Sequence, residues 1–209
     1  MKKIGFIAMG VVGLLFACAP ITQYPIQLRY VPQEEHAQTK EKLKAKVITV
    51  AAFRDKRGMA DPRAIGMRVK CNGKKIPFLT SEERADVEIT QAMKGYLSQK
   101  GYTVREETPQ WDLNSQTAQQ EWGNWVIGGA IEEFSVEVKS SFLRTVYECT
   151  LKLRVAATDV RKKKEMFQET IELSSSYKTF GFRLETAERM VNKLIAKAVE
   201  SALADIEKR

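Results

Sequence analysis

The sequence predicts an α+β domain, in which two amphipathic helices pack on one face of a twisted antiparallel sheet of about four to five strands. Residues 125–139, 143–159 and 166–177 alternate apolar and polar side chains, which is typical of strands with one wet face. Residues 81–100 and 187–206 instead place apolar side chains at helical spacing. Because such helices need an apolar surface to cover, we expect them on the dry face of the sheet.

Residues 1–17 have the pattern of a lipoprotein signal peptide. Lys2 and Lys3 precede an apolar run that is too short to span a membrane and that ends in Leu15-Phe16-Ala17-Cys18. A small residue directly before the cysteine resembles the bacterial lipobox, in which the Cys18 thiol is acylated and becomes the new N-terminus. The alternative is an ordinary cleaved signal with an incidental cysteine. We expect lipidation at Cys18.

Residues 18–45 are predicted to form a lipidated tether, and residues 46–209 a single α+β domain. Within the tether, apolar and polar residues alternate over 24–31, which favours a short strand. Pro25 lies inside this run, and proline is confined to sheet edges because it cannot donate a ladder hydrogen bond. A strand in the tether should therefore lie at an edge of the sheet.

The first half of the domain is predicted to hold short strands and one helix. Residues 46–53 have the β-branched composition of a buried strand, and 54–80 form a long excursion with a short strand around 67–71. Ser81 supplies a capping hydroxyl and is followed by acidic residues, so a helix should begin there and stop at Gly101.

The second half begins with a short strand over 102–105. Residues 106–124 are polar and aperiodic, which predicts an exposed loop. The three alternating strands that follow form an antiparallel meander, with turns at 140–141 and 161–164. A long amphipathic helix over 187–206 completes the domain.

Two cysteines, Cys71 and Cys149, lie in the predicted domain. In an exported protein they could form a disulfide, which would stabilise the fold by roughly 4 kcal/mol. Cys149 alternates with apolar residues on a predicted strand, so it fits a buried free thiol equally well. The sequence leaves the disulfide and the free thiols as equal alternatives.

The sequence lacks the side-chain patterns of an enzyme or a metalloprotein. His36 is the sole histidine, and it lies in the polar tether without a second ligand. Glu132 and Glu133 are adjacent on a strand, so they point to opposite faces unless a bulge intervenes. Gly128-Gly129 also lies within a strand, where it should permit a bulge or close helix packing. We expect no catalytic residue, no cofactor and no metal.

Two groups of residues are candidates for binding a partner or ligand. The first consists of tryptophans in the polar loop and the strand after it: Trp111, Trp122 and Trp125. They either anchor a partner or plug the open end of the core. The second consists of the basic residues of the last hairpin tip: Arg161, Lys162, Lys163 and Lys164. This tip is either a solvated turn or a contact for membrane phosphates.

The formal net charge of +8 fits an anionic partner or an anionic lipid surface. No nucleic-acid recognition motif accompanies this charge, and an exported chain rarely meets nucleic acid. We therefore expect no nucleic-acid partner.

With this layout, the chain resembles the YajG-like group of outer-membrane lipoproteins. The residues that carry the resemblance lie in four segments: 50–57, 65–66, 96–102 and 128–131. The same layout also looks like the lipoprotein subunits that assist lipid-handling ABC transporters or lipopolysaccharide delivery. The resemblance implies no enzymatic activity and defines no particular molecular role.

We therefore expect a non-catalytic lipoprotein, anchored by its N-terminal lipid at the periplasmic face of the outer membrane, that binds an envelope protein. Ala19, rather than aspartate, follows Cys18, and in enteric-type bacteria this permits sorting away from the inner membrane. The alternative is an auxiliary component of lipid or lipopolysaccharide transport. That role needs an apolar cavity between the helices and the sheet.

Overall fold

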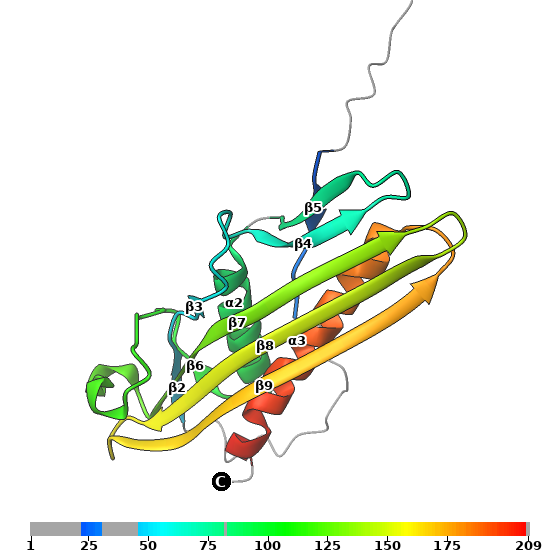
Figure 1. The fold of residues 1–209 in the computed structure, drawn as a ribbon. Coiled ribbons are helices and arrows are strands. Elements are labelled where there is room, and N and C mark those ends of the chain that lie inside the picture. The colour runs from blue at the N-terminus through cyan, green and yellow to red at the C-terminus, as the bar shows by residue number, and fades with distance from the viewer. Residues whose placement is uncertain (1–21, 31–45, 82, 208–209) are drawn as a thin grey trace, which may run out of the picture.

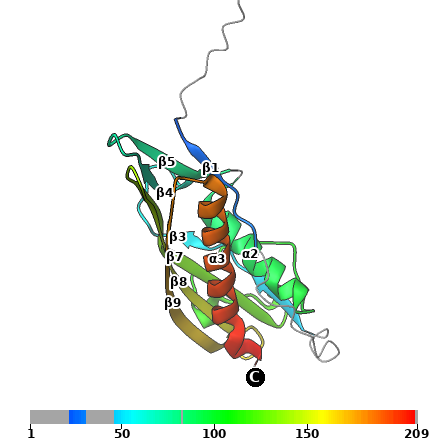
Figure 2. The same cartoon turned by 90° about the vertical axis from the view of Figure 1, so that its right-hand side faces the viewer.

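The computed structural model describes residues 22–30, 46–81 and 83–207. They form a mixed sheet of nine strands with two helices on one of its faces (Figures 1 and 2). The predicted α+β class is confirmed. The sheet is larger than the predicted four to five strands, however, and it is partly parallel rather than antiparallel.

The long antiparallel meander is confirmed, and it forms the body of the sheet. Its three strands are β7 (Trp125–Ser140), β8 (Thr145–Asp159) and β9 (Lys164–Thr179). Leu151 and Leu153 of β8 are fully buried in the core beneath the helices. On the other face, Lys152 forms an ion pair with Glu172 at 3.3 Å. The alternation of side chains therefore separates a dry face from a wet face, as predicted.

Six short strands enlarge the sheet. They are β1 (Tyr24–Ile26), β2 (Val47–Val50), β3 (Arg54–Asp55), β4 (Ala64–Val69), β5 (Lys75–Thr80) and β6 (Thr103–Val104). The strands β2, β3 and β4 each pair in parallel with β7, and β4 forms an antiparallel hairpin with β5. The excursion over 54–80 therefore contains three strands, where the sequence predicted one.

Strand β1 lies at an edge of the sheet and pairs in parallel with β5. Tyr24, Ile26 and Leu28 are buried, so residues 22–30 pack onto the domain. The remaining part of 18–45, which includes Cys18 and His36, lies outside the described residues.

The two helices are α2 (Ala85–Gln99) and α3 (Leu184–Glu207), and they contact each other as well as the sheet. The predicted cap at Ser81 is wrong, because Arg84 occupies the N-cap position and makes no side-chain capping bond. The Ser81 hydroxyl is buried without a hydrogen-bond partner. The predicted stop is confirmed, since Gly101 follows the helix with φ of 90°.

Gly128 and Gly129 create space for large side chains on the two faces of β7. A Cβ atom on Gly128 would lie 3.0 Å from the Trp111 ring. One on Gly129 would lie 2.5 Å from the Phe53 ring and 2.3 Å from the carbonyl oxygen of Arg154. The glycines therefore accommodate aromatic rings rather than a helix, and the irregularity of the β7–β8 ladder falls between Ile131 and Glu133.

Candidate functional site

The predicted loop over 106–124 is largely exposed, but its two tryptophans are buried. Residues 106–124 contain two short 3₁₀ helices, η1 (Ser115–Thr117) and η2 (Gln120–Trp122). Trp111 and Trp122 are only 2% and 8% exposed. They belong to a small second core together with Ala51, Ala118, Val126, Ala156 and Val160. The structure therefore favours the interpretation of Trp111 and Trp122 as core plugs over that of a partner anchor.

Hydrogen bonds fix this loop to its surroundings. The Trp111 Nε1 donates to the carbonyl oxygen of Asn114 at 3.0 Å. The Thr49 hydroxyl donates to the carbonyl oxygen of Trp122 at 2.6 Å. The Lys163 ammonium donates to the carbonyl oxygen of Ala118. Lys163, one of the four predicted binding residues of the hairpin tip, is therefore turned onto the loop.

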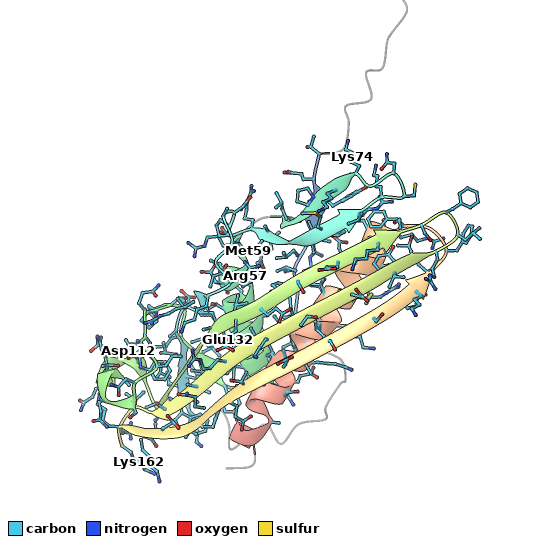
Figure 3. The ribbon with its side chains drawn as sticks, in the orientation of Figure 1. Arg57, Met59, Lys74, Asp112, Glu132 and Lys162 are labelled. Carbon is cyan, nitrogen blue, oxygen red and sulfur yellow. The ribbon has the colours of Figure 1, made fainter. Side chains whose placement is uncertain are left out.

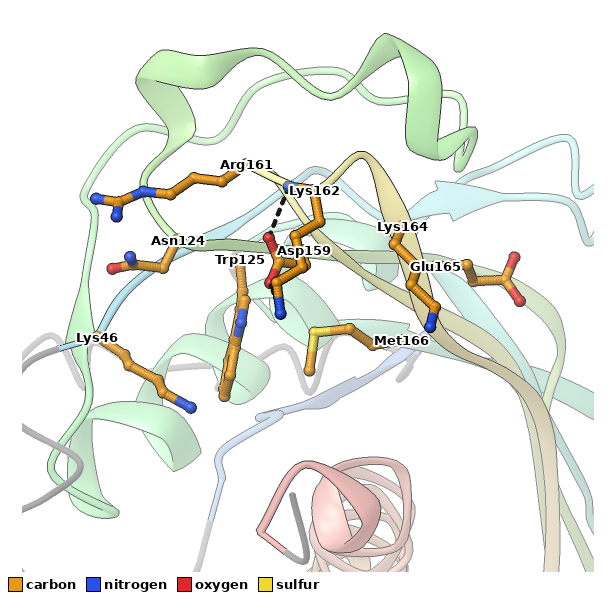
Figure 4. A pocket seen from close by; sticks show the side chains of 9 residues that line it. All are labelled: Lys46, Asn124, Trp125, Asp159, Arg161, Lys162, Lys164, Glu165 and Met166. Atoms are coloured by element: carbon orange, nitrogen blue, oxygen red, sulfur yellow. Dashed lines mark hydrogen bonds and ion pairs between the residues drawn. The ribbon is translucent and has the colours of Figure 1, made fainter.

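A pocket of about 490 Å³ lies where β7 begins and the β8–β9 hairpin turns (Figure 4). We call it the cationic pocket, and its lining residues are Lys46, Asn124, Trp125, Asp159, Arg161, Lys162, Lys164, Glu165 and Met166. The structure thus brings Trp125 together with three of the predicted basic residues, which the sequence had placed in separate candidate groups.

Trp125 forms an aromatic wall of the pocket. The Lys46 ammonium lies 3.8 Å from the centroid of its ring, within the range of a cation–π contact. The Tyr102 ring lies behind it, with the two ring centroids 6.2 Å apart. Trp125 is 7% exposed, so its neighbours hold the ring in place before any ligand arrives.

Asn124 joins three segments around the pocket. The side-chain oxygen of Asn124 accepts a hydrogen bond from the backbone amide of Val47 at 2.8 Å. The backbone amide of Asn124 donates to the carbonyl oxygen of Val47, also at 2.8 Å. The Asn124 carbonyl oxygen accepts from the Val160 amide at 2.9 Å. Sequence reasoning missed Asn124 and Lys46. Their only signal was their position, directly before the strands β7 and β2.

Positive charge predominates in the pocket. Arg161, Lys162, Lys164 and Lys46 face two carboxylates, those of Asp159 and Glu165. The Asp159 carboxylate accepts a hydrogen bond from the Lys162 amide at 2.9 Å, and the Lys162 ammonium lies 3.9 Å away. The remaining cations beside an aromatic wall suit an anionic group such as a carboxylate or a phosphate.

Glu132, one of the two adjacent glutamates considered as a carboxylate pair, is engaged in an ion pair. Glu132 occupies the bulge that would be needed to form a carboxylate pair (Figure 3), but its carboxylate lies 3.3 Å from the Arg154 guanidinium. Across residues 22–30, 46–81 and 83–207, no three His, Cys, Asp or Glu side chains form a group that could hold a metal ion.

The two cysteines of the domain are free thiols in separate environments. Cys71 is exposed in the turn between β4 and β5, whereas Cys149 is buried in β8. Burial raises the pKa of the Cys149 thiol to about 12, so this thiol stays protonated at neutral pH.

Fold and pocket together define an α+β domain with a cationic pocket at one end. Within the part of the chain that the structure describes, no helix is long and apolar enough to cross a membrane. No protein-family model matches the sequence, and no curated protein is significantly similar to it. The resemblance to the YajG-like group is therefore not confirmed.

A solved structure shares this fold at low sequence identity. Protein XCC0632 from Xanthomonas campestris, of the DUF330 family model, has a TM-score of 0.56 and 10% identity, over 90% of this chain and 96% of that one. PelC from Paraburkholderia phytofirmans has a TM-score of 0.40 and 15% identity, over 77% and 86% of the two chains. The LpoB C-terminal domain from Salmonella enterica has a TM-score of 0.33 and 8% identity, over 62% and 83%. The two lower scores do not establish a shared fold.

Proposed function

We propose that this chain is a non-catalytic, lipid-anchored lipoprotein of the bacterial outer membrane that binds an envelope partner through its cationic pocket. The observation that carries this proposal is the position of the pocket relative to the tether. The pocket lies at the start of β7, whereas β1, which the tether enters, begins at the level of Val136 near the end of β7.

This placement holds the pocket away from the anchor. The start of β1, level with Val136, and the pocket end at Trp125 are separated by eleven residues of β7, about 36 Å at 3.3 Å per residue. Figures 1 and 2 show β1 beginning toward one end of the molecule and the β8–β9 turn at the other. An anionic segment of a partner in the periplasm can reach the pocket there. With the anchor at the β1 end, this arrangement favours partner binding by residues 161–164 over their contact with the phosphates of the anchoring membrane.

The alternative role, in lipid transport, has less support. It needs an apolar cavity between helices and sheet, but Leu151 and Leu153 of the sheet and Ala198 of α3 are fully buried there. An open groove of about 400 Å³ does lie between β9 and α3. Arg189, Lys193 and Lys197 line it together with Leu173 and Met190, so it is a mixed surface groove rather than an apolar cavity.

Pocket variants test the binding role. Changing Arg161, Lys162 and Lys164 to glutamine should reduce recovery of the crosslinked partner from native membranes by roughly tenfold, because the anionic contacts are lost. The matched control changes Arg189, Lys193 and Lys197 to glutamine, which removes the same charge at exposed positions of α3 outside the pocket. Equal loss of partner in the two triple variants would contradict a role for the pocket.

A further inference from the structure

The end of the sheet opposite the pocket exposes large apolar side chains. Phe142 and Leu143, in the turn between β7 and β8, are 92% and 67% exposed, and Phe180, just after β9, is 76% exposed. Thr145, which begins β8, pairs with Thr179, which ends β9, so the two turns are neighbours at the same end of the sheet. We call Phe142, Leu143 and Phe180 the apolar tip. A monomer in water gains nothing from this exposure, so the tip is suited to an apolar environment.

The surface around the apolar tip is predominantly positively charged, and the two nearby carboxylates, Glu137 and Glu148, both lie within 4 Å of the Lys139 ammonium. Three segments reach this end of the sheet: 66–80, 140–147 and 173–183. None of them contains an aspartate or glutamate. Their basic residues are Arg68, Lys70, Lys74, Lys75, Arg144, Lys178 and Arg183. Phenylalanines surrounded by lysine and arginine suit the boundary between anionic headgroups and acyl chains.

The expected anchor lies near the same end. Strand β1 begins there, and Thr22 follows Cys18 by only four positions. Fully extended, this stretch spans at most about 14 Å. The β4–β5 turn and the β7–β8 turn lie toward the end at which β1 begins in both Figure 1 and Figure 2. A lipid on Cys18 therefore brings the membrane close to the apolar tip.

We infer that the apolar tip and its surrounding basic residues dock onto the anionic surface of the membrane that holds the lipid anchor, and so orient the domain. This inference rests on the proposed lipid anchor. The lipid anchor holds the chain at the membrane but leaves the domain free to rotate, whereas a second, electrostatic and apolar contact fixes its orientation. Docking at this end directs the cationic pocket into the periplasm.

The charge pattern disfavours a second copy of this chain as the occupant. Two such ends brought face to face would oppose like charges, Lys70 and Lys74 among them, since the nearby Glu137 and Glu148 are already paired with Lys139 of the same chain. An anionic bilayer instead supplies both the negative charge and the apolar phase that the surface lacks.

Cys71 provides a probe at this surface. It is exposed in the β4–β5 turn, whereas Cys149 is buried and protonated, so an environment-sensitive fluorophore will react with Cys71. The mature chain, purified from membranes and labelled, is reconstituted into vesicles of phosphatidylglycerol and phosphatidylcholine that carry brominated acyl chains. Brominated lipid should quench the label, and vesicles of phosphatidylcholine alone should quench it less, in a salt-dependent way.

Two variants make the test specific. Changing Phe142, Leu143 and Phe180 to serine should reduce quenching about twofold or more, because the tip no longer enters the acyl region. Changing Arg161, Lys162 and Lys164 to glutamine should leave quenching unchanged, since these residues lie at the pocket end.

Three outcomes would overturn the inference: an unquenched label in anionic vesicles, equal quenching in the serine variant, or a blue-shifted label without vesicles that depends on protein concentration. The last would show that a second copy covers the tip. The mass of the N-terminal peptide in the same preparation reports the anchor separately. Absence of an acyl group would refute the proposed anchor, and quenching of a Cys18→Ser chain, in which Cys71 is the accessible thiol, would then report on docking separately.

Discussion

Replacing Trp111 by alanine should lower the free energy of unfolding by about 3–5 kcal/mol. The ring is 2% exposed, lies against Gly128 and the second core, and its Nε1 donates to the carbonyl oxygen of Asn114. The substitution would remove this packing and leave a cavity on the face of the sheet that the loop covers. Denaturant titration followed by circular dichroism measures the change.

The neighbouring Gln110 gives a control for this experiment. It is exposed, so its replacement by alanine should change stability by no more than about 0.5 kcal/mol. If Trp111→Ala left stability nearly unchanged but abolished partner recovery, the loop would be a binding site and the core-plug interpretation would be wrong.

Replacing Leu153 by alanine should cost about 2–5 kcal/mol of stability, through lost burial and a residual cavity. Leu153 is fully buried and lies between Ile131 and Ile171 on the neighbouring strands. Lys152, one residue earlier, lies on the wet face in a surface ion pair with Glu172, so Lys152→Ala should change stability by at most about 1 kcal/mol. Urea titration of both variants compares the two faces. Equal effects would mean that the register of β8 is displaced by one residue.

The sequence predicted the elements that repeat a pattern over many residues. The three long strands and α3 each provide several periods of alternation or helical spacing. The strands β3 and β6 contain two residues each, too few to show any period. Their parallel pairing also depends on partners distant in the sequence, which local patterns do not encode. The predicted sheet was therefore too small and uniformly antiparallel.

The candidate site was predicted only in parts. The tryptophans and the basic tip were recognised by residue type, but their exposure depends on how residues 106–124 fold over the sheet. That fold turns Lys163 onto the loop and leaves Arg161, Lys162 and Lys164 in the pocket with Trp125. Phe142 and Phe180 gave no signal, because an apolar residue in a turn can be buried or exposed depending on tertiary packing alone.

The central claim is that a lipid on Cys18 anchors the domain with its cationic pocket directed away from the membrane. Its most direct test is the mass of the N-terminal peptide of the mature chain, purified from membranes. We expect a peptide that begins at Cys18 and carries the added mass of a diacylglyceryl group and an acyl chain on that residue. A mature chain that begins elsewhere, or a Cys18 with an unmodified thiol, would contradict the account.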